Sequence, residues 1–130
     1  MKVLLDTHVV LAVLRRRLAD EFPHFALLLS QNGADASASV ASLWEIAIKT
    51  RLGKLDAGIP LEAVVGFLKT SGIGLLPIEP AHVIAELDPL PPTRDPFDRL
   101  LLAQCQVENL RLLTIDRALV GHPLTAQSAP

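Results

Sequence analysis

Five acidic residues lie beside predicted buried strands or at predicted helix starts: Asp6, Glu45, Asp95, Asp98 and Asp116. Asp6 directly follows the apolar segment 3–5, and Asp116 lies just past the segment 111–114. Carboxylates that converge repel one another and lose hydration, so a group of them needs a compensating cation. Ligands that are all oxygen favour Mg²⁺, with Mn²⁺ as a substitute. Such a cation can orient a phosphodiester, activate a bound water and stabilise the leaving oxygen.

Apolar patterning and turn residues predict the elements that would position these acids. Strands are predicted over residues 3–5, 36–40, 75–78 and 111–114, with an additional edge strand over 123–126. Helices are predicted over residues 9–14, 19–30, 42–52 (capped by Ser42), 60–71, 80–87 and 96–108. Strands that alternate with helices form a parallel sheet covered on both faces. We therefore predict an α/β fold, a three-layer α/β/α domain with a four- to five-stranded parallel sheet.

This topology places the acids at one edge of the sheet. Residues that follow parallel strands lie at the carboxyl edge, where open α/β sheets bind ligands. Asp6 and Asp116 follow strands, and Glu45 lies in the first turns of the helix after the second strand. Asp95 and Asp98 begin the helix that leads into the fourth strand, so that helix also starts at this edge.

Helical phase turns two of the acids toward the core. Asp98 shares a stripe with Leu101 and Cys105, at spacings of three and seven residues. Glu45 leans to the same side of its helix as Ile48, three residues on. Both carboxylates are therefore predicted at the rim of an apolar face.

Each acid also has a purely structural interpretation. Asp95 is a suitable N-cap for the helix that follows, and Glu45 can form an i,i+4 ion pair with Lys49. Asp6 and Asp116 can each cap the next helix. Any one of these roles accounts for one acid, but independent placement of four acids at one edge is much less expected.

Composition fits one compact domain, residues 1–130, with a weakly ordered tail over residues 121–130. The net charge of −2 excludes a globally basic nucleic-acid binder. Contact with a polyanion would need a metal or local basic groups, although for any one such group a solvated helix face or loop is the favoured interpretation. The candidates are Arg15 to Arg17, the group of Lys49, Arg51 and Lys54, and the pair Arg94 and Arg99.

The single cysteine, Cys105, cannot form an internal disulfide, which favours a reducing, cytoplasmic compartment. No signal peptide or membrane span is predicted. Trp44, beside Glu45, is expected to pack in the core or at an interface. The histidines have no metal-ligand spacing and are expected to be structural or exposed: His8, His24, His82 and His122.

Four sequence blocks, residues 4–9, 42–49, 94–101 and 113–116, resemble PIN-domain toxins of the VapC type. They occur in the family's order and extend over most of the chain. The resemblance implies a PIN fold, Mg²⁺-dependent endoribonuclease activity on RNA, a homodimer and neutralisation by a cognate antitoxin protein.

The resemblance also implies roles for individual residues. Asp6, Glu45, Asp98 and Asp116 match the family's acidic quartet, which would be both catalytic and metal-binding. Asp95 would be an auxiliary acid, and Thr114 would place a hydroxyl near the metal. Two features depart from the pattern: Thr93 stands where many relatives have histidine, and residues 121–130 lack the usual aromatic-tipped last strand.

Three functional hypotheses follow. The first is metal-assisted RNA hydrolysis, with Lys49, Arg94 or Arg99 holding substrate phosphates. The second is a phosphatase with Asp6 as nucleophile, which is disfavoured because His8 stands where the haloacid type has a second aspartate. The third is a catalytically weak antitoxin-binding module, with a groove from the apolar segments 9–14 and 22–29 unless these are ordinary core faces.

Overall fold

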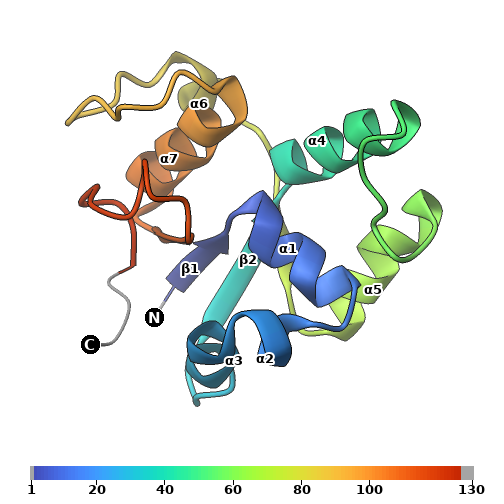
Figure 1. The fold of residues 1–130 in the computed structure, drawn as a ribbon. Coiled ribbons are helices and arrows are strands. Elements are labelled where there is room, and N and C mark those ends of the chain that lie inside the picture. The colour runs from blue at the N-terminus through green and yellow to red at the C-terminus, as the bar shows by residue number, and fades with distance from the viewer. Residues whose placement is uncertain (1, 127–130) are drawn as a thin grey trace.

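The computed structural model describes residues 2–126, and within them it contains a four-stranded sheet (Figure 1). The strands are β1 (Lys2–Leu5), β2 (Asp35–Ser39), β3 (Gly74–Leu76) and β4 (Arg111–Leu113). All neighbouring strands are parallel, in the order β3-β2-β1-β4. The predicted parallel sheet is confirmed. The fifth strand predicted over 123–126 is reduced to one parallel bridge between Leu112 and Thr125.

Helices pack on both faces of the sheet, which confirms the α/β/α prediction. They are α1 (Thr7–Leu14), α2 (Leu18–Glu21), α3 (Pro23–Leu29), α4 (Val40–Arg51), the 3-10 helix η1 (Leu61–Ala63), α5 (Val64–Thr70), α6 (Pro80–Ile84) and α7 (Pro96–Glu108). The apolar side chains of β1 pack into the helix layers on both faces of the sheet, because successive side chains of a strand point to opposite faces. Val3 and Leu5 join the cluster formed with α1 and α5, whereas Leu4 joins the cluster formed with α7.

Helix α7 has the bounds that the sequence predicts. The Asp95 carboxylate caps it by accepting the N–H groups of Phe97 at 2.8 Å and Asp98 at 3.3 Å. Asn109 ends it in the left-handed conformation, with φ 56°. Leu101 and Cys105 are buried, so the stripe inferred for Asp98 does face the core.

The predicted boundary between β2 and α4 is wrong. The strand ends at Ser39 rather than Val40, and Ser39, not Ser42, caps the helix by accepting the N–H of Ala41 at 3.0 Å. Ser42 is instead buried in α4, 3.0 Å from the hydroxyl of Thr7. The small residues of this segment suit a strand and a helix start equally well, so the pattern alone does not locate the junction.

The predicted helix over 19–30 is wrong as a single element, because the chain forms α2 and α3 with a break at Phe22. Pro23 has no N–H and disfavours helical geometry at the residue before it, and Phe22 has φ −134° and ψ 63°. Four other elements are shorter than predicted: β3 ends at Leu76, β4 ends at Leu113, α6 ends at Ile84, and the helix predicted from Pro60 begins at Leu61 as η1.

The apolar side chains of Val9–Leu14 are all buried in the core, which is the ordinary role considered for that segment. Residues 124–126 lie along β4, where the Leu112 N–H donates to Leu124 O at 2.8 Å. Residues 127–130 of the predicted tail lie outside the described residues. Across residues 2–126, no helix combines the length and apolar character needed to cross a membrane.

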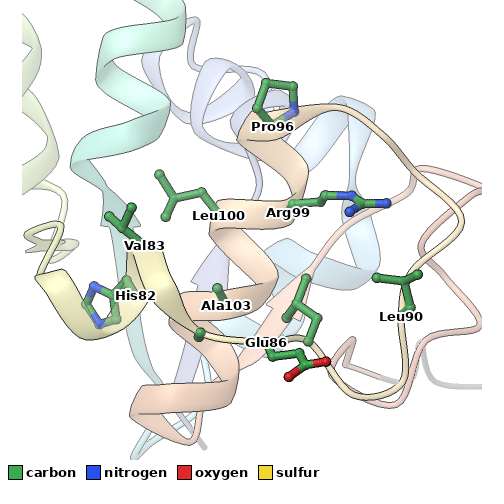
Figure 2. Close-up of a pocket in the computed structure, with 10 residues that line it drawn as sticks. His82, Val83, Glu86, Leu90, Pro96, Arg99, Leu100 and Ala103 are labelled. Atoms are coloured by element: carbon green, nitrogen blue, oxygen red, sulfur yellow. The ribbon is translucent and has the colours of Figure 1, made fainter.

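A groove of about 480 Å³ lies between α6, the loop after it and α7 (Figure 2). Most of the residues that line it are apolar, among them Val83, Leu90 and Leu100, and His82 also contributes. Arg99 lies on this groove, and its Nε donates to the carbonyl oxygen of Thr93 at 2.7 Å. None of the predicted quartet lines this groove, so it is separate from the acidic edge of the sheet.

Candidate active site

Asp6 is fixed at the end of β1 by both its backbone and its side chain. Its N–H donates to Leu113 O at 3.0 Å, and its Oδ1 accepts the N–H of Val9 at 2.9 Å, so it also caps α1. The residue is 5% exposed. Burial raises the pKa of Asp6, although hydrogen bonds from the Thr114 side chain and the Val9 N–H oppose the rise.

The Thr114 hydroxyl connects the acids that follow the neighbouring strands β1 and β4. It hydrogen-bonds to the Asp6 carboxylate and accepts the N–H of Asp116 at 3.0 Å. The Asp116 Oδ1 accepts the N–H of Ala118 at 2.9 Å. Asp6 and Asp116 therefore lie at the same edge of the sheet and share a hydroxyl that orients one and fixes the backbone of the other.

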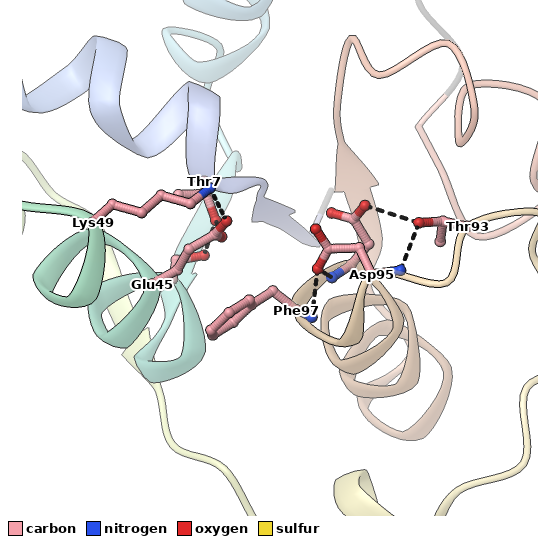
Figure 3. Close-up of polar contacts among 8 residues, drawn as sticks. Thr7, Glu45, Lys49, Thr93, Asp95 and Phe97 are labelled. Atoms are coloured by element: carbon pink, nitrogen blue, oxygen red, sulfur yellow. Dashed lines mark hydrogen bonds and ion pairs between the residues drawn. The ribbon is translucent and has the colours of Figure 1, made fainter. Parts of the chain in front are cut away.

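Glu45 reaches this edge from α4 and is 8% exposed. Its Oε1 accepts the Thr7 hydroxyl at 2.7 Å, and its Oε2 lies 2.7 Å from the Lys49 ammonium (Figure 3). The i,i+4 pair predicted from the sequence is thus present, and the hydrogen bond to Glu45 raises the pKa of Lys49. Because Thr7 directly follows Asp6, this bond ties α4 to the end of β1.

Asp95 lies across the site from Glu45, at the start of α7 (Figure 3), and Asp98 follows it in the first turn of the same helix. The Thr93 hydroxyl donates to Asp98 Oδ2 at 3.2 Å and accepts the N–H of Asp95 at 3.1 Å. Asp95 is exposed, whereas Asp98 is partly buried. Thr93 therefore orients an acid through its hydroxyl.

The acids from different elements share one electrostatic field. Burial raises the pKa of Asp98 to about 6, and the negative charges of Asp95, Asp116 and Glu45 contribute further, against the lowering effect of the hydrogen bond from Thr93. The positive charge of Lys49 lies within the same field, since Glu45, Asp95 and Asp98 all act on it. Loops and helices far apart in sequence therefore produce one negative region.

The donor chemistry of this region fits a hard divalent cation, because it consists of carboxylate and hydroxyl oxygens. Raised pKa values at Asp6 and Asp98 indicate carboxylates whose charge the protein does not fully compensate. As the side chains are oriented, no three acidic, histidine or cysteine residues among 2–126 form a group that could hold a metal ion. The acids thus form adjoining groups, with Thr114, Thr7 and Thr93 as their local hydrogen-bond partners.

Sequence reasoning named Thr114 as a hydroxyl near the acids but missed the contacts of Thr7 and Thr93 and one aromatic contact. Thr7 and Thr93 each adjoin a predicted acidic motif, which is the signal that could have found them. Trp44 is not a core residue, because it is 60% exposed. It contacts Phe97 edge-on, with ring centroids 5.8 Å apart and an interplanar angle of 70°.

A comparison with protein families matches the PIN domain over residues 3–121. The match covers most of the chain, which therefore belongs to the PIN-domain family. PIN domains are generally metal-dependent nucleases, and the acidic edge described above is consistent with that class. A comparison with curated proteins found no match.

Proposed function

We propose that this PIN domain is a Mg²⁺-dependent endoribonuclease of the VapC type, the toxin of a type II toxin–antitoxin pair. The observation that carries the proposal is the negative region at the sheet edge, where burial and neighbouring acids raise the pKa of Asp98 to about 6. Family membership supports nuclease chemistry. The resemblance of four sequence blocks to VapC toxins supports RNA as the substrate.

We propose Asp6 and Asp98 as the firmest ligands of the cation. Glu45 and Asp116 would complete its shell or hold its waters, with Asp95 as an auxiliary acid. A bound divalent cation supplies three effects: it orients the phosphodiester, lowers the pKa of a water and stabilises the leaving oxygen. Mg²⁺ is the proposed ion, and Mn²⁺ is the proposed substitute.

The chain's own residues prepare the acids for this role. The Thr114 hydroxyl and the Val9 N–H favour the ionised form of Asp6, which burial disfavours. Thr7 fixes one oxygen of Glu45 and Lys49 holds the other, so this carboxylate is oriented before substrate arrives. Preorientation of this kind matters because polar groups that support metal ligands typically change affinity or activity 10- to 100-fold.

Basic residues are proposed to hold substrate phosphates. Lys49 is the best placed, because it lies beside Glu45 and in the field of Asp95 and Asp98. Arg94 is exposed next to Asp95, whereas Arg99 would have to bind substrate with the guanidinium nitrogens that do not face Thr93. The resemblance extends the proposal to a cognate antitoxin, a homodimer and action in the cytoplasm.

Cleavage of a panel of structured and unstructured RNAs tests the enzymatic proposal. We expect cleavage with Mg²⁺ or Mn²⁺ and none with chelator. Asp6→Asn should reduce the rate more than about 100-fold, since loss of a ligand should cost more than loss of a supporting group. Asp20→Asn, an exposed acid on α2, is the matched control and should cleave normally. Full activity of Asp6→Asn, or cleavage that persists in chelator, would refute the proposal.

Expression in a bacterial host tests the toxin role separately. The wild-type chain should arrest growth, and Asp6→Asn should not, at equal protein levels. Equal growth arrest by both proteins would show that toxicity does not depend on the proposed site.

A further inference from the structure

The side chain of Trp44 is exposed at a position where exposure is unusual for so large an apolar group. It is 60% exposed, although tryptophan is normally well covered in folded proteins. It lies on α4 immediately before Glu45, a residue that is 8% exposed. The same turn of α4 thus carries an exposed aromatic side chain and a buried acid of the candidate active site.

Phe97, in the first turn of α7, contacts the indole of Trp44. The two rings meet edge-on, with centroids 5.8 Å apart and planes at 70°, which is a favourable geometry for aromatic pairs. Phe97 immediately precedes Asp98, and its N–H donates to Asp95 Oδ1 at 2.8 Å. Figure 3 shows its ring reaching from the start of α7 toward the helix that carries Glu45.

The aromatic pair therefore connects α4, which carries Glu45, with the first turn of α7, which carries Asp98. An edge-on contact fixes the orientation of the indole without covering it, as its exposure shows. The charge of this region is mixed, because Glu45 and Lys49 on the same helix form an ion pair at 2.7 Å and several other acids act on Asp98. An uncharged planar group is the ligand that suits such a surface best, because the acids repel an anion and the aromatic face binds a π-system.

We propose that Trp44 is a stacking platform for an unpaired base of the nucleic acid that this site cleaves. The inference rests on the proposed nuclease function and adds a residue that binds a base of the substrate rather than a phosphate. The base would stack on the indole while the adjoining phosphodiester passes the acids on either side. Stacking is tolerant of sequence because every base has a π-face, so Trp44 favours unpaired segments over duplexes rather than one particular base.

The chain provides its own probe of this contact, because Trp44 is its only tryptophan. The Asp6→Asn protein, which should not cleave the strand, is titrated with a single-stranded oligoadenylate, and tryptophan emission is recorded. Stacking should quench the emission with saturation. An abasic strand of equal length and charge, and a duplex of the same length, should quench little. Equal quenching by the abasic strand would show that phosphates rather than bases contact the region and would overturn the proposal.

Variants test whether the contact matters for binding and cleavage. Trp44→Ala should weaken binding of a labelled single strand about 10-fold in anisotropy measurements, within the range typical of one stacked base. Trp44→Phe should retain most of the affinity. In the active protein, Trp44→Ala should raise KM by a similar factor with little change in kcat, and the salt dependence of binding should be unchanged because no phosphate contact is lost.

Leu52→Ala is the matched control, since Leu52 is 63% exposed at the other end of the same helix. It should bind and cleave like the wild type, and thermal unfolding should show that both variants are folded. Wild-type KM in a folded Trp44→Ala protein would overturn the stacking role and leave the nuclease function intact. A wild-type protein that cleaves no RNA would overturn both.

A protein interface is the alternative use of this surface, and the same fluorescence separates it. Emission that changes when the protein alone is diluted, but not when single-stranded RNA is added, would assign Trp44 to a contact between protein chains. That outcome would also overturn the proposal.

Discussion

Asp98→Asn should stabilise the protein when no metal is bound. With Mg²⁺ present, the same substitution should abolish cleavage of RNA. The substitution keeps the shape of the side chain and removes its charge. In the folded chain, burial and the charges of Asp95, Asp116 and Glu45 raise the pKa of Asp98 from 3.8 to about 6. The ionised carboxylate is therefore a cost to folding at neutral pH, and the asparagine is not.

The size of the effect follows from that difference. Each pKa unit corresponds to about 1.4 kcal/mol, so the shift sets an upper limit of about 3 kcal/mol. Asp98 is only partly buried, and solvent screening reduces this limit, so we expect about 1 kcal/mol. For a chain of this length, that corresponds to a rise in Tm of about 3–5 °C.

The pH dependence has a definite sign. An acid with a raised pKa in the folded state costs nothing below its unfolded pKa, and its cost grows as the pH rises through the folded pKa. The stability difference between Asp98→Asn and the wild type should therefore be near zero at a pH near 4, increase up to about pH 6 and stay constant above it. Urea unfolding in chelator at several pH values measures this difference.

Exposed Asp20 supplies the control, since Asp20→Asn should change stability little at any pH. A loss of stability in Asp98→Asn at pH 7.5, or a difference that does not vary between pH 4 and 7, would refute the reasoning. With Mg²⁺ present, the same variant should lose cleavage, because the charge that destabilises the free protein is the one proposed to bind the cation.

Two further predictions concern the support of the site and the core. Thr114→Val removes the hydroxyl that bonds to Asp6 and to the Asp116 N–H. The rate of cleavage should fall about 10- to 100-fold. The pH–rate profile should shift to higher pH, because loss of this hydrogen bond raises the pKa of Asp6 further. An unchanged pH–rate profile would contradict that role. Leu102→Ala empties a fully buried position on α7 and should lower the free energy of unfolding by about 2–5 kcal/mol, measured with urea. A loss below about 1 kcal/mol would mean that α7 packs more loosely than its burial implies.

The strand order of the sheet was not predicted, but the edge that carries the acids was. Parallel strands leave their following residues at a common edge, so Asp6 and Asp116 could be placed from local patterns alone. Helix α7 was predicted with its true bounds because Asp95 and Pro96 mark its start and apolar periodicity marks its length. These features depend on short stretches of sequence, so local patterns were enough to predict them.

The parts that could not be predicted depend on contacts between distant segments. The bond from Thr7 to Glu45 spans 38 positions, and a short hydroxyl has no periodic signature. The contact of Trp44 with Phe97 needs the relative placement of α4 and α7, which no local pattern supplies. The break before Pro23 is different, because proline is itself a helix-boundary signal and was available in the sequence.

The sheet order also sets when the site can exist during synthesis of the chain. Since β1 lies between β2 and β4, the first strand can pair on one side early but keeps an open edge until the last strand has been made. The Asp6 N–H and the Asp6 carboxylate form hydrogen bonds with Leu113 and Thr114, so neither bond can form until the chain has been made past residue 112. A nascent chain that stops before β4 therefore carries most of the acids but not the framework that arranges them, so the acidic edge is completed only when the last strand has been made.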